Sequence, residues 1–282
     1  MLADCHIHMV LDGRDWRGAL ARHADHPNRQ TIRKKLEIYR EKGFSYLRDG
    51  GDRFGVGAAA REMAPEYGLV YRTPLAPLYP AGHYGRMLGL PFDSLAHYRS
   101  RVAELKRNGA DFLKIMISGL MDFDRFGVLT EEGPEPEEIR QMIEIAHGEG
   151  LSVMAHANGP RAVEAAASAG VDSVEHGAYA GAEALAAMAE RGVVWVPTLS
   201  AVANLRNTGR FDRESLDKIL ADTTAALAAF QKMGGLIAPG SDAGAFAVRH
   251  GTMTEYALLE KALGPLAWKS LEQGAQAIAH KF

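Results

Sequence analysis

The 282-residue sequence has little cysteine, little net charge and no long hydrophobic run, and each shortage argues against a class of protein. Cys5 is the only cysteine, so the chain can form no internal disulfide and needs no oxidising compartment. The formal charge is −3, and the densest cationic run is Arg33-Lys34-Lys35, which argues against binding to nucleic acid or to an anionic membrane. No stretch is apolar over the about 20 residues that span a bilayer, and the N-terminus does not read as a signal peptide. We therefore expect a cytoplasmic protein.

Glycine is abundant, with 30 residues, and it marks a regular alternation of strand and helix patterns. Short apolar runs indicate strands, and longer stretches with helical apolar spacing lie between them. We expect strands at residues 2–10, 44–49, 69–76, 112–118, 152–158, 173–178, 193–199 and 236–242. We expect helices at residues 31–42, 57–67, 94–108, 135–149, 160–169, 181–191, 212–233 and 252–263. Seven glycines follow a helix and precede a strand, where a left-handed helix end favours this residue: Gly43, Gly68, Gly109, Gly150, Gly170, Gly192 and Gly234.

Eight strands, each followed by a helix, predict an α/β fold, a single (β/α)8 TIM barrel that occupies residues 1–282 as one domain. In such a barrel the C-terminal ends of the strands carry the chemistry. The longest segments between elements, 77–93, 118–134 and 200–211, all follow strands and would lie at that end. We expect these segments to be lids over the active site.

The first predicted strand carries two histidines. Because side chains alternate along a strand, Asp4, His6 and His8 are expected on one face. Cys5 would lie on the other face as buried packing. The His-x-His pair alone fits two structural histidines as well as it fits a metal site. The ends of other predicted strands add residues of the types that ligate metals, and strand ends converge in a barrel: Lys114, His156, His176 and Asp242.

This ordered pattern of His-x-His, Lys, His, His and Asp resembles that of the amidohydrolase superfamily of metal-dependent hydrolases, over nearly the whole chain. Four phrases resemble its prolidase and imidazolonepropionase-like branch: Arg48-Asp49-Gly50-Gly51, Ala81-Gly82-His83, Val174-Glu175-His176-Gly177 and Pro239-Gly240-Ser241-Asp242. That branch usually carries a flanking β-sandwich. Here we expect a barrel without it, followed by one amphipathic helix within residues 265–282, and we expect barrel surface left uncovered to favour a homo-oligomer.

The resemblance implies two divalent metal ions, usually zinc. His6, His8 and Asp242 would hold one ion, and His156 and His176 would hold the other. Lys114 would bridge them as the carbamate formed with carbon dioxide, because a buried ammonium is costly and cannot ligate a metal. The alternative is a partly exposed, unmodified lysine at a strand end.

The implied reaction is hydrolysis of an amide (C–N) bond by a metal-bridging hydroxide, in a small molecule such as a cyclic amide or a dipeptide-like compound. Asp242 would accept the hydroxide proton and deliver it to the leaving nitrogen. The same ligands would also serve an ester, lactone or phosphotriester hydrolase or a ring deaminase, because substrate loops decide between them. A non-catalytic binder or sensor of a metal or small molecule is a third hypothesis.

Residues near the expected strand ends are candidates for substrate contact. The resemblance implies this role for His83, and position suggests it for His250. Tyr84, Tyr179 and Arg48 are further candidates, with packing as their alternative role. Asp4 is expected to orient a ligand imidazole or to form a cap or buried ion pair. The other histidines lie outside the strand ends and are expected to be solvated or structural: His23, His26, His97, His147 and His280.

Overall fold

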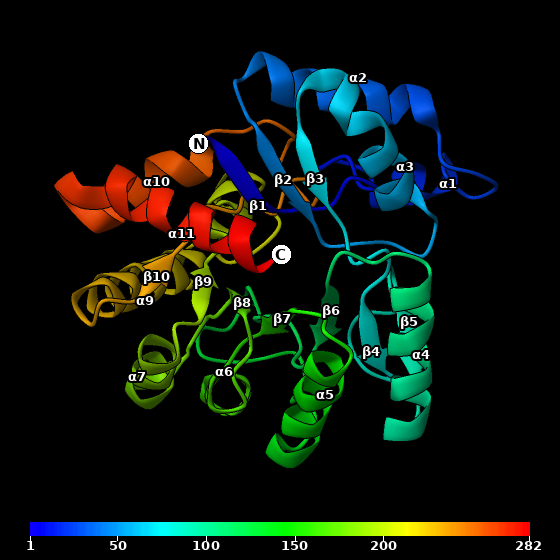
Figure 1. Cartoon of the computed structure of the whole chain (residues 1–282). Helices are drawn as coiled ribbons and strands as arrows, with labels where there is room; N and C mark the ends of the chain where they lie inside the picture. The colour runs from blue at the N-terminus through cyan, green and yellow to red at the C-terminus, as the bar shows by residue number, and fades with distance from the viewer.

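The computed structural model describes residues 1–282, in which parallel strands are surrounded by helices (Figure 1). The strands are β1 Ala3–Ile7, β2 Tyr46–Asp49, β3 Val70–Arg72, β4 Leu78–Pro80, β5 Leu90–Phe92, β6 Leu113–Met116, β7 Val153–Ala157, β8 Ser173–His176, β9 Val194–Val196 and β10 Leu236–Ile237. The α-helices are α1 Trp16–Ala21, α2 Arg29–Glu41, α3 Val56–Met63, α4 Leu95–Arg107, α5 Pro136–Gly148, α6 Pro160–Ser168, α7 Gly181–Arg191, α8 Leu199–Ala203, α9 Arg213–Lys232, α10 Thr254–Leu263 and α11 Ala267–Lys281. Short 3₁₀ helices are η1 Ala64–Tyr67, η2 Asn204–Asn207 and η3 Gly264–Leu266. The predicted α/β class is confirmed.

All paired strands are parallel, and they form two ladders, with the orders β1-β2-β3 and β10-β9-β8-β7-β6-β4-β5. Backbone hydrogen bonds join the ladders on both sides. On one side the N–H of Cys5 donates to the carbonyl of Pro239 at 2.8 Å. On the other, the N–H of Asp111 donates to the carbonyl of Thr73 at 3.0 Å. The closed eight-stranded barrel stays a prediction, because the two ladders are not one continuous sheet.

The eight predicted strands all occur within their expected ranges, although each is shorter. The segment 77–93 is not the plain loop that was predicted, because it contains β4 and β5, and the segment 200–211 contains most of α8. The helix α1 was also missed. These elements have six residues or fewer, too few to show a clear apolar period. The helix predicted within residues 265–282 is α11.

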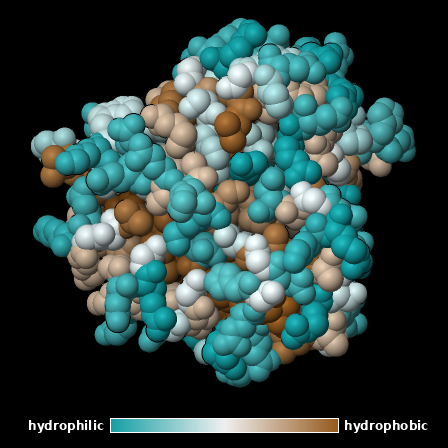
Figure 2. All heavy atoms as spheres, in the orientation of Figure 1, coloured by the Kyte–Doolittle hydropathy of each residue, from teal (hydrophilic) through white to brown (hydrophobic).

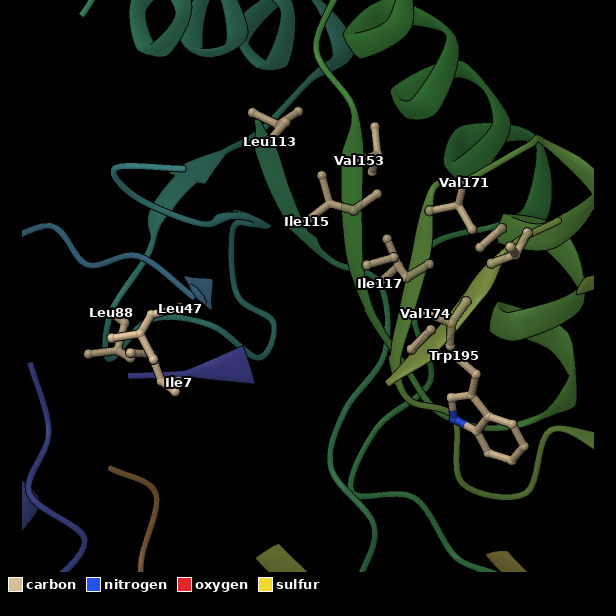
Figure 3. Close-up of a cluster of buried hydrophobic side chains, with 14 of the residues drawn as sticks. Ile7, Leu47, Leu88, Leu113, Ile115, Ile117, Val153, Val171, Val174 and Trp195 are labelled. Carbon is tan, nitrogen blue, oxygen red and sulfur yellow. The ribbon is translucent and has the colours of Figure 1, made fainter. Parts of the chain in front are cut away.

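Most buried apolar side chains belong to one cluster of 59 residues that includes strand and helix residues. Figure 3 shows how such side chains follow one another on neighbouring strands, among them Ile115 on β6, Val153 on β7 and Val174 on β8. Parallel strands that are buried on both faces read as almost continuous apolar runs, which is why the sequence pattern located them.

A second cluster of 11 buried residues joins the beginnings of the strands to α11. It contains Phe112 and Val194, at the starts of β6 and β9, together with Ile278 and Phe282. The hydroxyl of Ser152, just before β7, donates to the carbonyl of Lys281 at 2.6 Å. In Figure 1, α11 (red) runs from the left of the view to its middle, between β1 and β8, and ends at the C-terminus. The helix therefore covers the N-terminal ends of the strands, and the C-terminal ends face the opposite way.

The face that carries α11 is mostly hydrophilic, with separate hydrophobic patches (Figure 2). Leu266 and Trp268, at 67% and 51% exposure, are the most exposed large apolar residues. No helix combines the length and the apolar character that a membrane crossing requires. The homo-oligomer stays a prediction.

Candidate metal centre and active site

Parallel pairing brings three of the predicted ligands to the same end of neighbouring strands. Met116 of β6 pairs with His156 of β7, and Ala157 of β7 pairs with His176 of β8. Lys114 lies two residues before Met116 and therefore points to the same side of the sheet. Residues far apart in the sequence thus meet at the C-terminal ends of the strands.

His6, His8 and Asp242 form a compact group, with ligand atoms that all lie within 4.8 Å of one another. Asp242 Oδ1 is 3.6 Å from His6 Nε2 and 3.3 Å from His8 Nε2. This buried carboxylate oxygen has no hydrogen-bond partner in the protein. A buried, unpaired carboxylate oxygen facing two ring nitrogens is costly unless a cation joins them. The group therefore fits a divalent metal ion.

Lys114, His156 and His176 extend this group. Lys114 Nζ lies 3.3 Å from His6 Nε2, and the ring centroid of His176 lies 5.1 Å from that of His6 and 4.5 Å from that of His156. We call the six residues the strand-end cluster: His6, His8, Lys114, His156, His176 and Asp242.

The two histidines of β7 and β8 each use one ring nitrogen within the protein. His156 Nε2 is 3.1 Å from the carbonyl oxygen of Gly119, to which it can donate. His176 Nδ1 is 2.7 Å from the hydroxyl oxygen of Thr198. The second ring nitrogen of each histidine has no protein partner, which is the arrangement that a metal-binding imidazole requires. The pair therefore fits a second cation.

Burial favours the neutral forms that ligate metals. It lowers the pKa of His156 to about 3, and it lowers the pKa values of His6 and His176 well below the usual 6.5. A neutral imidazole keeps the lone pair that a metal accepts. Burial also lowers the pKa of Lys114, whose residue is only 1% exposed, and so favours its amine form.

A buried ion-pair network fixes the orientation of His6. Glu175 Oε2 lies 2.7 Å from His6 Nδ1. Arg48 donates to Glu175 Oε1 at 2.8 Å, and it also donates to Ser173 Oγ and to the carbonyl of Cys5. Because Nδ1 is held by a carboxylate, Nε2 is the nitrogen that His6 presents to the cluster.

The sequence analysis did not identify Glu175 as the residue that orients His6. A usable signal was present, because Glu175 and Arg48 are charged residues on strands that otherwise read as buried. A charge buried in a protein needs an opposite charge or several hydrogen bonds. The two residues are therefore each other's expected partners once both strands are placed in one core.

The structure decides between the two roles expected for Asp4 and favours the capping role. Its carboxylate accepts hydrogen bonds from the N–H and the hydroxyl of Ser241, at 2.8 Å and 2.6 Å. Burial raises the pKa of Asp4 to about 7. Asp4 therefore holds the residue before Asp242 and does not contact an imidazole of β1.

Strict alternation along β1 is also wrong, because the pairing of β1 with β2 shifts register between Asp4 and Ile7. Cys5 is buried as predicted, but it packs in the cluster that contains Phe112 and Met154. Those two residues lie two positions before Lys114 and His156 on their strands and share their faces. Cys5 therefore lies on the ligand side of the sheet.

The backbone around the strand-end cluster is strained and closely packed. Three non-glycine residues have positive φ angles: His176 at 68°, Thr198 at 51° and Asp242 at 58°. Such conformations cost about 1–3 kcal/mol each and concentrate at functional sites. At Gly50, a Cβ atom would lie only 2.5 Å from Cε1 of His8, so glycine gives this imidazole its space.

A cavity of about 510 Å³ opens above the cluster. Five cluster residues line it, and His6 lies beneath them, fully buried. All three predicted lid segments contribute to its wall, for example through Leu88, Phe123 and Phe211. The sequence analysis missed the contributions of Trp16 on α1 and Phe246 after β10. The cavity is deep enough to bring a small molecule against the cluster.

Two of the predicted substrate contacts lie at this cavity. His83 lines it and is largely exposed, with Nδ1 at 3.6 Å from Glu131 Oε1. Tyr84 also lines it, and its ring centroid is 4.9 Å from that of His156. Burial raises the pKa of Tyr84, so its hydroxyl keeps its proton.

The other three candidates lie outside the cavity lining. All the hydrogen bonds of Arg48 are to the network beneath His6. Tyr179 packs against Phe126, with ring centroids 5.5 Å apart. His250 Nε2 is 2.9 Å from the carbonyl oxygen of Leu11, and its Nδ1 is 3.1 Å from the hydroxyl of Tyr39. Arg48, Tyr179 and His250 thus have internal contacts, which for Arg48 and Tyr179 is the packing role given as the alternative, and their contact with substrate stays a prediction.

Comparison with known proteins agrees with this geometry. Ochratoxinase of Aspergillus niger is 28% identical over 304 residues, which cover 90% of this chain and 61% of the ochratoxinase. Its crystal structure matches with a TM-score of 0.74 at 23% identity, over 97% of this chain and 69% of that chain. A Xaa-Pro dipeptidase with bound methionine matches with a TM-score of 0.77 at 21% identity, over 99% of this chain and 75% of that chain. Residues 4–272 match the model of the Amidohydrolase family, and the chain therefore belongs to that family.

Proposed function

We propose that this chain is a metal-dependent hydrolase that cleaves an amide (C–N) bond of a small molecule. The observation that carries the proposal is the gathering of the six-residue strand-end cluster at the base of one cavity. The kinship with an ochratoxinase and the similarity in fold to a dipeptidase support an amide as the bond that is cleaved.

Two divalent ions, zinc in our proposal, match the donor set. His6, His8 and Asp242 would hold one ion, and His156 and His176 would hold the other. When bound, such ions polarise a substrate carbonyl and lower the pKa of water to roughly 7. Neutral imidazoles and an unpaired carboxylate oxygen are the protein groups that this chemistry needs.

We propose that Lys114 serves as a carbamate between the two ions. The amine of Lys114 would bond to the carbon of carbon dioxide and release a proton, which leaves an anion with two ligand oxygens. Asp242 is otherwise the only anion in the cluster, against roughly four positive charges from two ions. A second anion at Lys114 reduces that excess, whereas an ammonium would add to it.

Asp242 is positioned to move a proton in the reaction. Its Oδ1 atom is unpaired, and the residue lines the cavity. The carboxylate accepts a proton from the attacking water while the water oxygen bonds to the carbonyl carbon. It then delivers that proton to the leaving nitrogen as the C–N bond breaks. In this proposal Tyr84 would donate a hydrogen bond to the substrate carbonyl oxygen, which its protonated hydroxyl and its position beside His156 support, and His83 would contact substrate nearer the mouth.

The proposal includes the closed (β/α)8 barrel. The bonds from Cys5 to Pro239 and from Asp111 to Thr73 support it, because they connect the two ladders on both sides. The similarity in fold to the dipeptidase and the ochratoxinase supports it as well. Closure explains why residues after β10 reach those of β1.

The test is a hydrolysis panel combined with metal analysis of the purified protein. The panel contains N-acyl amino acids, dipeptides and cyclic amides, with matched esters, lactones, a phosphotriester and an aminated ring. We expect about two divalent ions per chain and turnover of at least one amide. Chelation should abolish that turnover, and zinc should restore it.

Other outcomes would redirect the proposal. Turnover of esters, lactones, phosphotriesters or the aminated ring without any amide would favour the corresponding alternative on the same metal site. Bound metal with no turnover of the whole panel would favour a binder or sensor. Amide hydrolysis that is unaffected by complete metal removal would contradict the proposed mechanism.

A further inference from the structure

Glu255, on the first turn of α10, is a buried carboxyl group that has no cationic partner. The residue is 1% exposed and belongs to no ion pair. Burial raises the pKa of this carboxyl group to about 8, and the charge of Asp4, another carboxyl group, also acts to raise it. Burying such a group costs free energy that an apolar side chain of similar size would not cost. The role of Glu255 therefore has to be sought in its hydrogen bonds.

These hydrogen bonds hold the start of α8. Oε1 of Glu255 accepts a hydrogen bond from the N–H of Leu199 at 3.0 Å. Oε2 accepts hydrogen bonds from the N–H and from the hydroxyl of Ser200, at 2.7 Å and 2.8 Å. The helix α10 is itself anchored to β1, because the hydroxyl of Tyr256 donates to the carbonyl of Ala3 at 2.9 Å. Glu255 therefore joins a fixed helix to the first turn of α8.

Thr198 comes directly before this turn and contacts the strand-end cluster. Its φ angle is 51°, a left-handed conformation that is unusual for a β-branched residue. Such a backbone persists only where surrounding contacts hold it, and Glu255 holds the two residues that follow, Leu199 and Ser200. The hydroxyl oxygen of Thr198 is 2.7 Å from His176 Nδ1. The position of that hydroxyl therefore depends on the carboxyl group of Glu255.

A similar arrangement lies beside another residue of the strand-end cluster. Asp4, which is also buried, accepts hydrogen bonds from the N–H and the hydroxyl of Ser241. The next residue is Asp242, which has a φ angle of 58°. In both places a buried carboxyl group holds the backbone next to a left-handed residue at the cluster. This repetition, in two loops that are distant in the sequence, favours a positioning role over a purely local helix cap.

We propose that Glu255 is a positioning residue that acts through Thr198 to orient the imidazole of His176 toward a metal ion. With Nδ1 held by the threonine hydroxyl, Nε2 is the nitrogen that His176 presents to the cluster. This inference rests on the proposed function, which assigns a second ion to His176 and its neighbour on β7. It adds the group outside the cluster that keeps this half of the centre in place.

Zinc titration of the metal-free protein, followed by competition with a chelating dye, is the first test. Glutamine is close to glutamate in size but has one acceptor oxygen in place of two, so in Glu255→Gln the N–H of Leu199 or of Ser200 loses its partner. We expect this variant to bind one of the two ions about tenfold more weakly and the other ion normally. Glu260→Gln changes an exposed carboxylate on the same helix and should bind both ions normally. Unchanged affinity in Glu255→Gln would overturn the inference.

A double-mutant cycle tests the route through Thr198. Thr198→Val removes the hydroxyl and keeps the branched shape, and it should weaken the same ion by about tenfold. Thr198→Ser keeps the hydroxyl and should bind both ions normally. Because Glu255 acts through that hydroxyl, Glu255→Gln should add little to the loss already present in Thr198→Val. Additive losses in the double variant would refute the route. Thermal melting checks that each variant folds, and Glu255→Asp replaces Glu255→Gln in the cycle if the latter does not fold.

Nitrogen NMR of the metal-free protein separates this inference from the proposed function. Burial lowers the pKa of His176, so its ring is neutral at pH 7 and shows which nitrogen carries the proton. The signals are assigned by their loss in His176→Gln. We expect one tautomer in the wild type and in Glu260→Gln, and a mixture in Glu255→Gln and Thr198→Val.

The possible results distinguish the two proposals. A mixture of tautomers in Glu255→Gln supports the inference even if the protein binds a single ion or cleaves no amide, in which case the proposed function fails by itself. Binding of two ions and amide cleavage, together with an unchanged tautomer of His176 in Glu255→Gln, refute the inference and leave the proposed function standing.

Discussion

The base and the mouth of the cavity are built in opposite ways. At the base, the residues of the strand-end cluster lie in the strands or shortly after them and are mostly buried, and further buried groups such as Glu175 and Thr198 fix its rings. At the mouth, Trp16 begins the short helix α1, Phe246 and Arg210 lie between elements, and all three are exposed. The base is suited to one fixed chemistry, and the mouth is suited to selecting what reaches it.

This division implies that substitutions at the two places should affect different quantities. Changes at the base should reduce kcat or metal affinity, because they remove or misplace groups that take part in the reaction. Changes at the mouth should mainly raise KM for particular substrates. The following predictions test that separation.

The largest effect is expected for Asp242→Asn. The amide cannot accept a proton from the attacking water, so kcat should fall by on the order of 10³-fold. Some metal should stay bound through the histidines, whereas His6→Ala should lose metal first. Steady-state kinetics and metal analysis of the same preparations measure both quantities. Undiminished turnover in Asp242→Asn would refute the proton transfer assigned to this carboxylate.

Lys114→Ala should lower kcat by on the order of 10²-fold, because the cluster loses its second anion. Adding a small carboxylate such as formate or propionate should restore part of the rate, since it can take the place of the carbamate oxygens. The comparison is with Lys106→Ala, which changes an exposed lysine on α4. A normal rate and metal content in Lys114→Ala without any added carboxylate would count against the bridge.

Glu175→Gln tests the support beneath the base. The substitution weakens the hydrogen bond to His6 Nδ1 and leaves Arg48 without its charge partner. Because His6 is then less firmly oriented, metal affinity should fall by about tenfold. Competition with a chelating dye measures that affinity, and thermal melting measures stability separately. Ser173→Ala removes a contact of Arg48 and a hydrogen bond to Glu175 Oε1 but keeps the carboxylate beside His6 Nδ1, and it serves as the control. A drop in melting temperature with unchanged metal affinity would reduce Glu175 to a structural role.

The smallest effect is expected at the mouth. Phe246→Ala removes a partly exposed ring that contributes about 1 kcal/mol of apolar contact, so KM for an aromatic amide should rise about fivefold with kcat unchanged. Met253→Ala changes an exposed apolar residue outside the cavity and should leave KM as it is. A fall in kcat instead would contradict the expectation that the mouth affects mainly KM and the base affects kcat.

Several features of the fold follow from the sequence alone. Short apolar runs that follow glycine-marked helix ends located most of the strands, because strands buried on both faces are read directly as apolar runs. The six residues of the strand-end cluster were singled out because their types, at the C-terminal ends of parallel strands, have to converge. Side chains at strand ends are positioned by the backbone, so local pattern is enough to find them.

The supports and the mouth were decided by the tertiary structure. Glu175 was not paired with His6, two roles were left open for Asp4, and the register shift in β1 moved Cys5 to the ligand side. Phe246 and Arg210 were not identified because they lie in irregular segments. The contacts of these residues depend on how loops that are distant in the sequence pack against one another. Short-range periodicity in a sequence does not predict such long-range contacts.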